Sequence, residues 1–321
     1  MQKYKITSIG EILFDVYPDE KNIGGAPFNF IYHIIKIAGR GNFISRIGND
    51  ELGKEILQLM SKNNIESGFI QIDDEHPTGT AIANLDAEKI PHWKIEEERA
   101  YDFINQTKDL KKIIKTETSC LYFGTLAQRN GTTRKTIQSL FNEKIKFFCD
   151  LNIRQKFYSK EIIEKSLYAA NVLKLNIDEL KIVNDLLMKA TFHLEDGNNY
   201  FEMEKLAKQM IDTFGIELLC ITLGEDGAIL INANETNHFK IKVDEIVDTV
   251  GAGDAYAAVL CLGYLRGWSL ETINLLATSF AADVVKIKGA LPDDEMFYDK
   301  IKRDICDIGV DHDEERIGKS Q

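Results

Sequence analysis

The segment KFFCDLNIRQKFYSKEIIEKSLYAANVLKLNIDEL, residues 146–180, decides the fold class. Two short apolar runs in it, Lys146–Asp150 and Val172–Leu175, are typical of buried strands. Between them, Lys160–Ala169 has the apolar spacing of an amphipathic helix. A strand, a helix and a second strand in succession predict a βαβ unit, which builds a parallel sheet.

The same alternation extends in both directions along the chain. Further strands are predicted at Tyr4–Ile9, Phe43–Ile47, Phe69–Ile72, Cys120–Phe123, Glu217–Leu223 and Ala228–Ile231. Further helices are predicted at Pro27–Ala38, Asp50–Asn63, Thr132–Phe141, Ile177–Met188, Tyr200–Phe214, Gly251–Arg266 and Leu270–Val285. We therefore predict an α/β fold, doubly wound, with a mainly parallel central sheet flanked by helices.

Two segments depart from this alternation. Thr78–Ile95 consists of two alternating runs joined at Asp86–Lys89, which predicts a β-hairpin. An insertion of this length is more often a lid or a binding element than a decoration, so we expect a small β lid from segments near residues 16–23 and 78–96. Residues 306–321 are polar and acidic, and are predicted to be a mobile tail after a single domain spanning residues 1–305.

Composition restricts the possible partners. The chain has 321 residues, 44% of them hydrophobic, and 51 acidic against 39 basic residues give a net charge of −12. This charge opposes non-specific nucleic-acid binding, so an anionic ligand must be held by local groups. Five widely spaced cysteines, four of them in apolar runs, favour buried reduced thiols and a reducing compartment. No apolar stretch has the length of a signal peptide or a membrane span, so we expect a cytoplasmic protein without a membrane partner.

One carboxylate, Asp254, stands in the glycine-rich stretch IVDTVGAGDAYAAV, residues 246–259. A helix is predicted to begin there, so the amides of Ala252, Gly253 and Asp254 lack partners within the helix. The positive end of a helix attracts anions, and glycine lets a phosphate approach closely. Asp254 is then placed to accept a proton from a hydroxyl next to that phosphate. Alternatively, Asp254 only stabilises its own helix, by about 0.3–1 kcal/mol, and this stretch alone does not distinguish the two.

Other phosphate-binding patterns are missing from the sequence. It has no GxxxxGK[ST], and GAGDAY lacks the third glycine of a dinucleotide-binding fingerprint. Six stretches taken together are more specific: GEILFD (10–15), GGAPFN (24–29), DLNIR (150–154), KLNIDEL (174–180), TLGEDGAIL (222–230) and DTVGAGD (248–254). In this order and spacing they resemble the PfkB, or ribokinase-like, family of sugar kinases over about residues 4–300. The first two stretches look most like those of bacterial fructokinases.

The resemblance implies a ribokinase-like fold and an ATP-dependent sugar kinase. The γ-phosphoryl group would pass to a primary hydroxyl of a small sugar, with fructose as the expected acceptor. Two alternatives remain open. The acceptor could be 2-keto-3-deoxygluconate, ribose or a nucleoside, or the protein could be a sugar-binding regulator that has lost catalysis. The family also implies Mg²⁺ with the nucleotide and a possible homodimer formed through the lid.

Residue roles carried over from the family begin with the catalytic turn. Asp254 would be the general base, and the amides of Gly251, Ala252 and Gly253 would stabilise the charge on the transferred phosphoryl group. The sugar hydroxyls and the phosphate would be held by a further set of substrate-binding residues, which comprises Asp15, Gly24, Gly25, Asn29 and Arg154. The alternatives are a solvated loop acid for Asp15, an ordinary loop before a helix for Gly24 and Gly25, and an exposed loop arginine for Arg154.

A second set would bind the nucleotide and its ions. Asn176 and Glu179 stand where family members hold Mg²⁺ through water, although an N-x-x-E sequence is also a helix capping box. Thr222, Gly224 and Gly227 would line the ribose and phosphates, or form a plain hairpin turn. The family further implies a site for a monovalent cation such as K⁺, at Asp248, at the carbonyl of Val250 and at carbonyls around Val284, Ile287 and Gly289.

Two positions depart from the family pattern. Phe28 and Phe30 flank Asn29 where relatives often have small residues, so a reshaped sugar pocket is expected. In the lid, Trp93 and Arg99 are placed either to touch the sugar or to face solvent.

Overall fold

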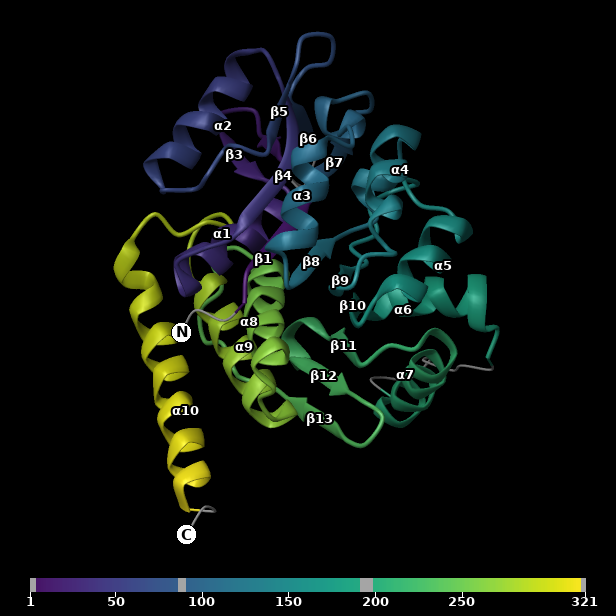
Figure 1. The fold of residues 1–321 in the computed structure, drawn as a ribbon, viewed down its shortest axis with the longest axis vertical. Coiled ribbons are helices and arrows are strands. Elements are labelled where there is room, and N and C mark those ends of the chain that lie inside the picture. Colours follow the sequence, from purple (N-terminus) through teal and green to yellow (C-terminus); the bar gives the residue numbers. More distant parts are fainter. Residues whose placement is uncertain (1–3, 86–90, 191–198, 319–321) are drawn as a thin grey trace.

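The computed structural model describes residues 4–85, 91–190 and 199–318, and omits the side chains of 84, 85, 91, 92 and 309–318. A sheet of nine strands crosses the described part of the chain (Figure 1). Its spatial order is β13 (Thr236–Phe239), β12 (Ala228–Ile231), β11 (Leu218–Thr222), β10 (Val172–Asn176), β9 (Lys146–Asp150), β8 (Cys120–Phe123), β1 (Ile6–Ile9), β4 (Asn42–Gly48) and β5 (Ile70–Asp73).

Neighbouring strands are parallel throughout β5, β4, β1, β8, β9, β10 and β11. At the other edge of the sheet, β12 pairs antiparallel with β11, and β13 pairs antiparallel with β12. The predicted mainly parallel sheet is therefore confirmed. Register determines which side chains meet at its carboxyl edge. Lys174 lies opposite Asp150 on β9, and Asn176 lies opposite Thr222 on β11.

Helices cover both faces of this sheet. Alternate residues of a strand point to opposite faces, and the apolar residues on each face pack against helices. On β8, Cys120 and Tyr122 belong to one hydrophobic cluster, and Leu121 and Phe123 belong to the other. The first cluster includes residues of α1 (Ala26–Ala38), α2 (Glu51–Lys62), α8 (Ala252–Arg266), α9 (Leu270–Val284) and α10 (Asp299–Gly318). The second includes residues of α3 (Lys108–Thr116), α4 (Gly131–Ser139), α5 (Lys160–Ala169), α6 (Ile177–Val183) and α7 (Tyr200–Phe214).

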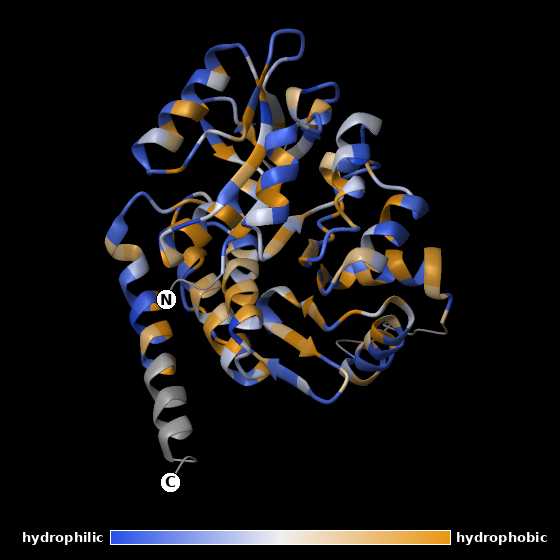
Figure 2. Cartoon of the chain, viewed as in Figure 1, coloured by the Kyte–Doolittle hydropathy of each residue, from blue (hydrophilic) through white to orange (hydrophobic). Residues whose placement is uncertain are grey.

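Hydrophobic residues concentrate on the strands and on the inner sides of the helices, and hydrophilic residues on the loops and outer helical surfaces (Figure 2). Four cysteines, Cys120, Cys149, Cys220 and Cys261, are buried and free, as predicted. Among the described helices none is long and apolar enough to cross a membrane.

A smaller sheet forms the predicted lid. Its order is β3 (Lys21–Gly24), β2 (Leu13–Val16), β6 (Gly79–Leu85) and β7 (Pro91–Ile95), with β2 and β6 parallel and the outer pairs antiparallel. The hairpin is confirmed, and its expected connection, Asp86–Lys89, lies outside the described residues. The lid has an apolar core of its own with the segments after β7, β8 and β9, formed by Leu13, Ala81, Ile95, Tyr101, Leu126 and Phe157.

Some elements differ from the sequence predictions. The expectation of an irregular tail over 306–321 is wrong, because α10 continues to Gly318. Ile301 and Ile305, one helical turn apart, pack into the core and anchor that helix. The predicted helix over Ile177–Met188 divides into α6 and a π-helical turn at Asn184–Met188. α3, β13 and the short 3₁₀ segment η1 (Ala100–Phe103) were not predicted. Further 3₁₀ segments are η2 (Leu126–Gln128), η4 (Gly224–Asp226) and η5 (Glu295–Tyr298).

Candidate active site

The GAGD turn forms the first turn of α8, and no side chain caps it. Gly251 is left-handed, with φ 81° and ψ −9°, and a Cβ there would lie 2.4 Å from the Cβ of Ala290. Only glycine fits this position without strain. No described residue accepts a hydrogen bond from the amides of Gly253 or Asp254, and Gly253 is exposed. The positive end of α8 is therefore open to a ligand.

Asp254 lies at this open helix end and is partly exposed. Its Oδ2 accepts a hydrogen bond from Nδ2 of Asn29 at 2.8 Å. Burial raises the pKa of Asp254 to about 6, with a contribution from the charge of Asp150, and Asn29, Lys174 and Arg154 oppose the increase. A carboxylate with such a pKa is a stronger base than an ordinary aspartate and is still largely ionised at neutral pH.

Asn29 comes from α1, another helix that begins at a glycine without a capping side chain. Gly25 has φ 106°, and a Cβ there would lie 2.6 Å from the carbonyl oxygen of Glu11. The buried Oδ1 of Asn29 has no hydrogen-bond donor among the described residues. Phe28 and Phe30 on either side are fully buried in the core, and Phe30 stacks on Tyr122. Neither ring therefore lies at the surface, and their effect on the shape of the sugar pocket stays a prediction.

The lid brings Asp15 to the same edge of the large sheet. Its Oδ2 lies 2.8 Å from the position that a Cβ on Gly24 would occupy, so a side chain at Gly24 would displace the carboxylate. Burial raises the pKa of Asp15 to about 6, and the positive charge of Arg154 opposes the increase. The positive charge of Arg154 thus acts on both Asp15 of the lid and Asp254 of α8.

Arg154 belongs to a strained loop after β9. Asn152 and Gln155 have φ of 40° and 50°, in the left-handed region that non-glycine residues rarely adopt. Such strain persists only where the surroundings hold it, and it often marks functional sites. The loop is held from two sides: Glu179 Oε1 accepts from the amide of Ile153 at 2.7 Å, and Gln155 Nε2 donates to the carbonyl of Trp93 at 2.5 Å.

Asn176 and Glu179 form a capping box at the start of α6. Oδ1 of Asn176 accepts from the Glu179 amide, and Oε2 of Glu179 accepts from the Asn176 amide, both at 2.9 Å. Glu179 is 5% exposed, and each of its oxygens accepts from a backbone amide. The structural alternative predicted for this pair is therefore confirmed, and a role toward Mg²⁺ stays a prediction.

The predicted nucleotide residues follow β11. Thr222 ends this strand beside Asn176. Gly227 has φ 81°, and a Cβ there would lie 2.0 Å from the carbonyl oxygen of Phe239, so the turn itself requires glycine. Gly224 also has a positive φ of 61°, but a Cβ there would meet no atom within 4 Å. The turn alone accounts for Gly227, and contacts of these residues with the ribose stay a prediction.

Asp248 connects the segment before the GAGD turn to the loop after α9. Its oxygens accept from the amides of Val250 and Gly289, each at 3.0 Å. The carbonyl of Val284 accepts from the amide of Ile287. The residues predicted around a monovalent cation thus lie in two joined loops, and cation binding stays a prediction.

A surface cavity of about 320 Å³ lies between the segment leading to the GAGD turn and α9. Its lining combines aliphatic and charged side chains, among them Ile241, Val243, Ser279, Ala282, Asp283 and Lys300. Two further aliphatic side chains of that segment, Ile246 and Val247, are more than half exposed. The sequence analysis did not predict this cavity.

The sequence analysis also assigned no role to two charged residues beside the GAGD turn, Lys174 and Asp150. Nζ of Lys174 lies 2.8 Å from Oδ2 of Asp150, and the hydroxyl of Tyr122 donates to the same oxygen at 2.9 Å. Lys174 Nζ is also 3.4 Å from the position of a Cβ on Gly253. The lysine inside the apolar strand VLKLN could have indicated this pair. A buried ammonium requires a partner, so an acidic residue was to be expected next to it.

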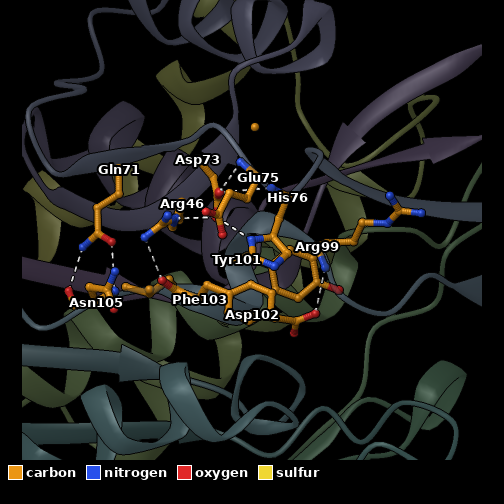
Figure 3. A network of polar contacts seen from close by, with 12 residues as sticks. Arg46, Gln71, Asp73, Glu75, His76, Arg99, Tyr101, Asp102, Phe103 and Asn105 are labelled. Atoms are coloured by element: carbon orange, nitrogen blue, oxygen red, sulfur yellow. Dashed lines mark hydrogen bonds and ion pairs between the residues drawn. The ribbon is translucent and has the colours of Figure 1, made fainter.

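A polar network joins β4 and β5 of the large sheet to η1, the segment that follows β7 (Figure 3). Asp73 pairs with Arg46 at 2.7 Å and accepts from His76, whose ring stacks on Phe103. Arg46 also donates to the carbonyl of Phe103, which closes the network on η1. From η1, Asp102 holds Arg129 through two hydrogen bonds of 2.8 Å. This network holds the segment that follows β7 in place.

Comparison with known proteins agrees with this geometry. The model of the pfkB family carbohydrate kinases matches residues 5–295. An ATP-dependent 6-phosphofructokinase of Thermoanaerobacterium thermosaccharolyticum is 26% identical over 306 residues, which are 91% of this chain and 91% of that protein. A fructokinase of Escherichia coli is 25% identical, over 89% of this chain and 95% of that protein. The crystal structure of a Pyrococcus horikoshii sugar kinase in complex with ATP has a TM-score of 0.75 at 23% identity, covering 94% of this chain and 99% of that one. The chain therefore belongs to the PfkB family of carbohydrate kinases.

Proposed function

We propose that this protein transfers the γ-phosphoryl group of ATP to a primary hydroxyl of a small neutral sugar, with fructose as the acceptor. The kinase would be a single domain over residues 1–305. The observation that carries the proposal is the open end of α8, where free amides stand beside a carboxylate of raised pKa that Asn29 orients.

Asp254 takes the proton of the acceptor hydroxyl as the oxygen attacks phosphorus. The bond to the acceptor oxygen forms while the bond between the γ-phosphorus and the bridging oxygen of ADP breaks, and the proton stays on Asp254 until solvent removes it. The amides of the turn from Gly251 to Gly253 donate to the phosphoryl oxygens, where negative charge is concentrated. The lid, which carries Asp15, excludes water that would otherwise accept the phosphoryl group.

The sugar would lie between the lid and the sheet edge. Asp15 would accept hydrogen bonds from its hydroxyls, and the free Oδ1 of Asn29 would accept another. Gly24 and Gly25 leave the space that a side chain would fill. Arg154 would bind at the anionic end of the site, next to the transferred phosphate. The positive charge of Arg154 lowers the pKa of both Asp15 and Asp254, which supports this placement.

ATP would lie along the ends of β10 and β11. Thr222, Gly224 and Gly227 would follow its ribose and phosphates, and the adenine would occupy the cavity lined by Ile241, Val243 and Ala282. Mg²⁺ would arrive with the phosphates and neutralise part of their charge. Because both oxygens of Glu179 already accept from backbone amides, this residue would hold Mg²⁺ through water. K⁺ would bind at the joined loops of Asp248, Val250, Val284, Ile287 and Gly289.

A panel of acceptors tests this function. Purified protein is supplied with MgATP and with fructose, fructose 6-phosphate, 2-keto-3-deoxygluconate, ribose or a nucleoside, and ADP release is followed. We expect the highest kcat/KM for fructose. A higher value for another acceptor would reassign the substrate. Fructose binding in calorimetry without transfer to any acceptor would instead favour a regulator.

Two further proposals concern the surroundings of the enzyme. The edge strands β3 and β7 of the lid each have one unpaired side, so a second copy would pair there, and light scattering would detect the homodimer. The four free buried cysteines support a reducing compartment, and we propose the cytoplasm.

A further inference from the structure

Lys174 lies beneath the open end of α8. Only 9% of its side chain is exposed, and its Nζ is 3.4 Å from the position that a Cβ on Gly253 would occupy. Because Gly253 itself is exposed, the ammonium is close to the surface that a ligand on this turn would touch. An ammonium has three donors, and Asp150 is the acceptor of one of them.

The ammonium is held in place by a chain of two further side chains. Asp150 is 2% exposed, and its Oδ2 accepts from both Lys174 and the hydroxyl of Tyr122. Burial favours the uncharged amine, but the Asp150 carboxylate outweighs it and raises the pKa of Lys174 above its usual value. Lys174 therefore stays charged, and its orientation is fixed before a ligand arrives.

Stability alone is a weak reason for this pair. A buried ion pair is often no more stabilising than apolar residues of the same volume, since removing two charges from water is costly. Fixed charge in a site that excludes water does, however, stabilise a transition state strongly, because no reorganisation is needed during the reaction.

We propose that Lys174 is a further catalytic residue, whose ammonium contacts the phosphoryl group during its transfer to the acceptor. Asp150 and Tyr122 are positioning residues that hold this ammonium beside the GAGD turn. Lys174 keeps its proton throughout, and the proton of the acceptor hydroxyl goes to Asp254. The inference rests on the proposed function, since it requires that a phosphoryl group pass over this turn.

The two charges act on Asp254 in opposite directions. Lys174 lowers the pKa of Asp254, and Asp150 raises it. The other groups that face Asp254 are Asn29 from α1, Arg154 from the loop after β9, Glu11 after β1 and Tyr122 from β8. Replacing Lys174 leaves these groups in place, and replacing Asp150 alters only the hydrogen-bond partner of Tyr122, an uncharged group. Each replacement therefore predicts a shift of defined sign in the pH dependence of kcat.

The test compares four variants of the full chain by steady-state kinetics from pH 5 to 8. We expect Lys174→Met to lower kcat about a hundredfold, the effect of losing one donor to the transition state, with the KM of the acceptor little changed. Its acid limb, the pH range in which kcat rises as Asp254 loses its proton, should move to higher pH. Lys174→Arg should recover part of kcat and keep the limb of the wild type. Asp150→Asn should move the limb to lower pH, the opposite direction.

Lys36→Met is the matched control, because Lys36 is a second buried lysine paired with a carboxylate, that of Glu295, on another part of the molecule. It should leave kcat and the acid limb unchanged. If Lys174→Met does not fold, the arginine and asparagine variants still carry the test. Two results with an active wild type would overturn this inference. One is a Lys174→Met variant that keeps kcat within threefold of the wild type. The other is a pH dependence of kcat that shifts neither in Lys174→Met nor in Asp150→Asn. A wild type without transfer to any acceptor would instead overturn the proposed function.

Discussion

The helices α6 and α8 both begin at the site, and their first turns are built in opposite ways. Each has an acidic residue in its first turn, Glu179 in α6 and Asp254 in α8. In α6 the acid returns to its own backbone and completes a capping box. In α8 the acid accepts from a different helix, and no described residue accepts from the amides of Gly253 or Asp254. An acidic residue at a helix start thus indicates a functional site only when it does not accept a hydrogen bond from the backbone of its own helix.

The remaining helices strengthen this contrast. Six more described helices, α2, α3, α4, α5, α7 and α9, begin at a side chain that accepts from their own first turn. α1 and α8 begin instead at glycines without such a cap, and the hydrogen bond between Asn29 and Asp254 joins those two turns. The two helix starts without a side-chain cap in this set therefore meet at one place, and at the start of α8 an anion is the natural partner of the free amides of Gly253 and Asp254.

The largest effect is expected at the carboxylate of α8. Asp254→Asn keeps the shape of the residue and removes its ability to take a proton, so kcat should fall at least about a hundredfold. Acceptor affinity measured by calorimetry should stay within a few-fold of wild type, because the amide still accepts through its oxygen. Turnover close to that of the wild type would remove the role of Asp254 as base.

The glycine that begins α8 can be compared with the glycine that ends it. Gly251→Ala would force both a left-handed alanine and an overlap with Ala290, and should lower the free energy of unfolding by roughly 3 kcal/mol or more. Gly267→Ala has a similar φ of 70° but meets no atom within 4 Å, and should cost only about 1–2 kcal/mol. Equal losses in urea denaturation would contradict this account of the turn.

The cap of α6 should affect stability more than chemistry. Asn176→Ala removes the acceptor of the Glu179 amide and should lower the free energy of unfolding by about 1 kcal/mol. Its kcat should fall much less than that of Asp254→Asn. If Asn176→Ala instead abolished turnover at unchanged stability, the N-terminus of α6 would be a direct ligand site and the contrast with α8 would fail.

A smaller effect concerns the pH dependence that Asp254 confers. The folded state raises the pKa of Asp254 from 3.8 to about 6, so protonated Asp254 prevails below that pH and kcat should rise with pH through about 6. A raised pKa also means that the folded state binds the proton more tightly than the unfolded chain. The contribution of Asp254 to stability is therefore lost as pH rises from about 4 to 6. In Asp254→Asn this part of the pH dependence of unfolding should disappear.

Most of the frame was predictable from sequence, because apolar runs and helical spacing are local signals. The strands Cys120–Phe123 and Lys146–Asp150 agree with the prediction to the residue, and the lid hairpin was recognised from alternation. α3 was missed because only three of its residues, Leu110, Ile113 and Ile114, are buried. α10 was missed because its polar sequence conceals the apolar pair that anchors it.

The site was predictable only in part. The glycines and Asp254 form a short local pattern, so the open turn was expected from sequence. The pairing of Lys174 with Asp150 depends on the register between β9 and β10, which no single segment encodes. The double use of Glu179, by its own helix and by Ile153, likewise depends on where the loop after β9 lies. Long-range register is what the sequence analysis lacked.

The most direct test of the central claim is a crystal structure with ADP, aluminium fluoride and the acceptor found by the panel. The account predicts that the fluoride group contacts the amides of Gly251–Gly253 and the ammonium of Lys174, with the acceptor hydroxyl within hydrogen-bond distance of Asp254. A fluoride group bound elsewhere, or an acceptor oxygen that Asp254 cannot reach, would contradict it.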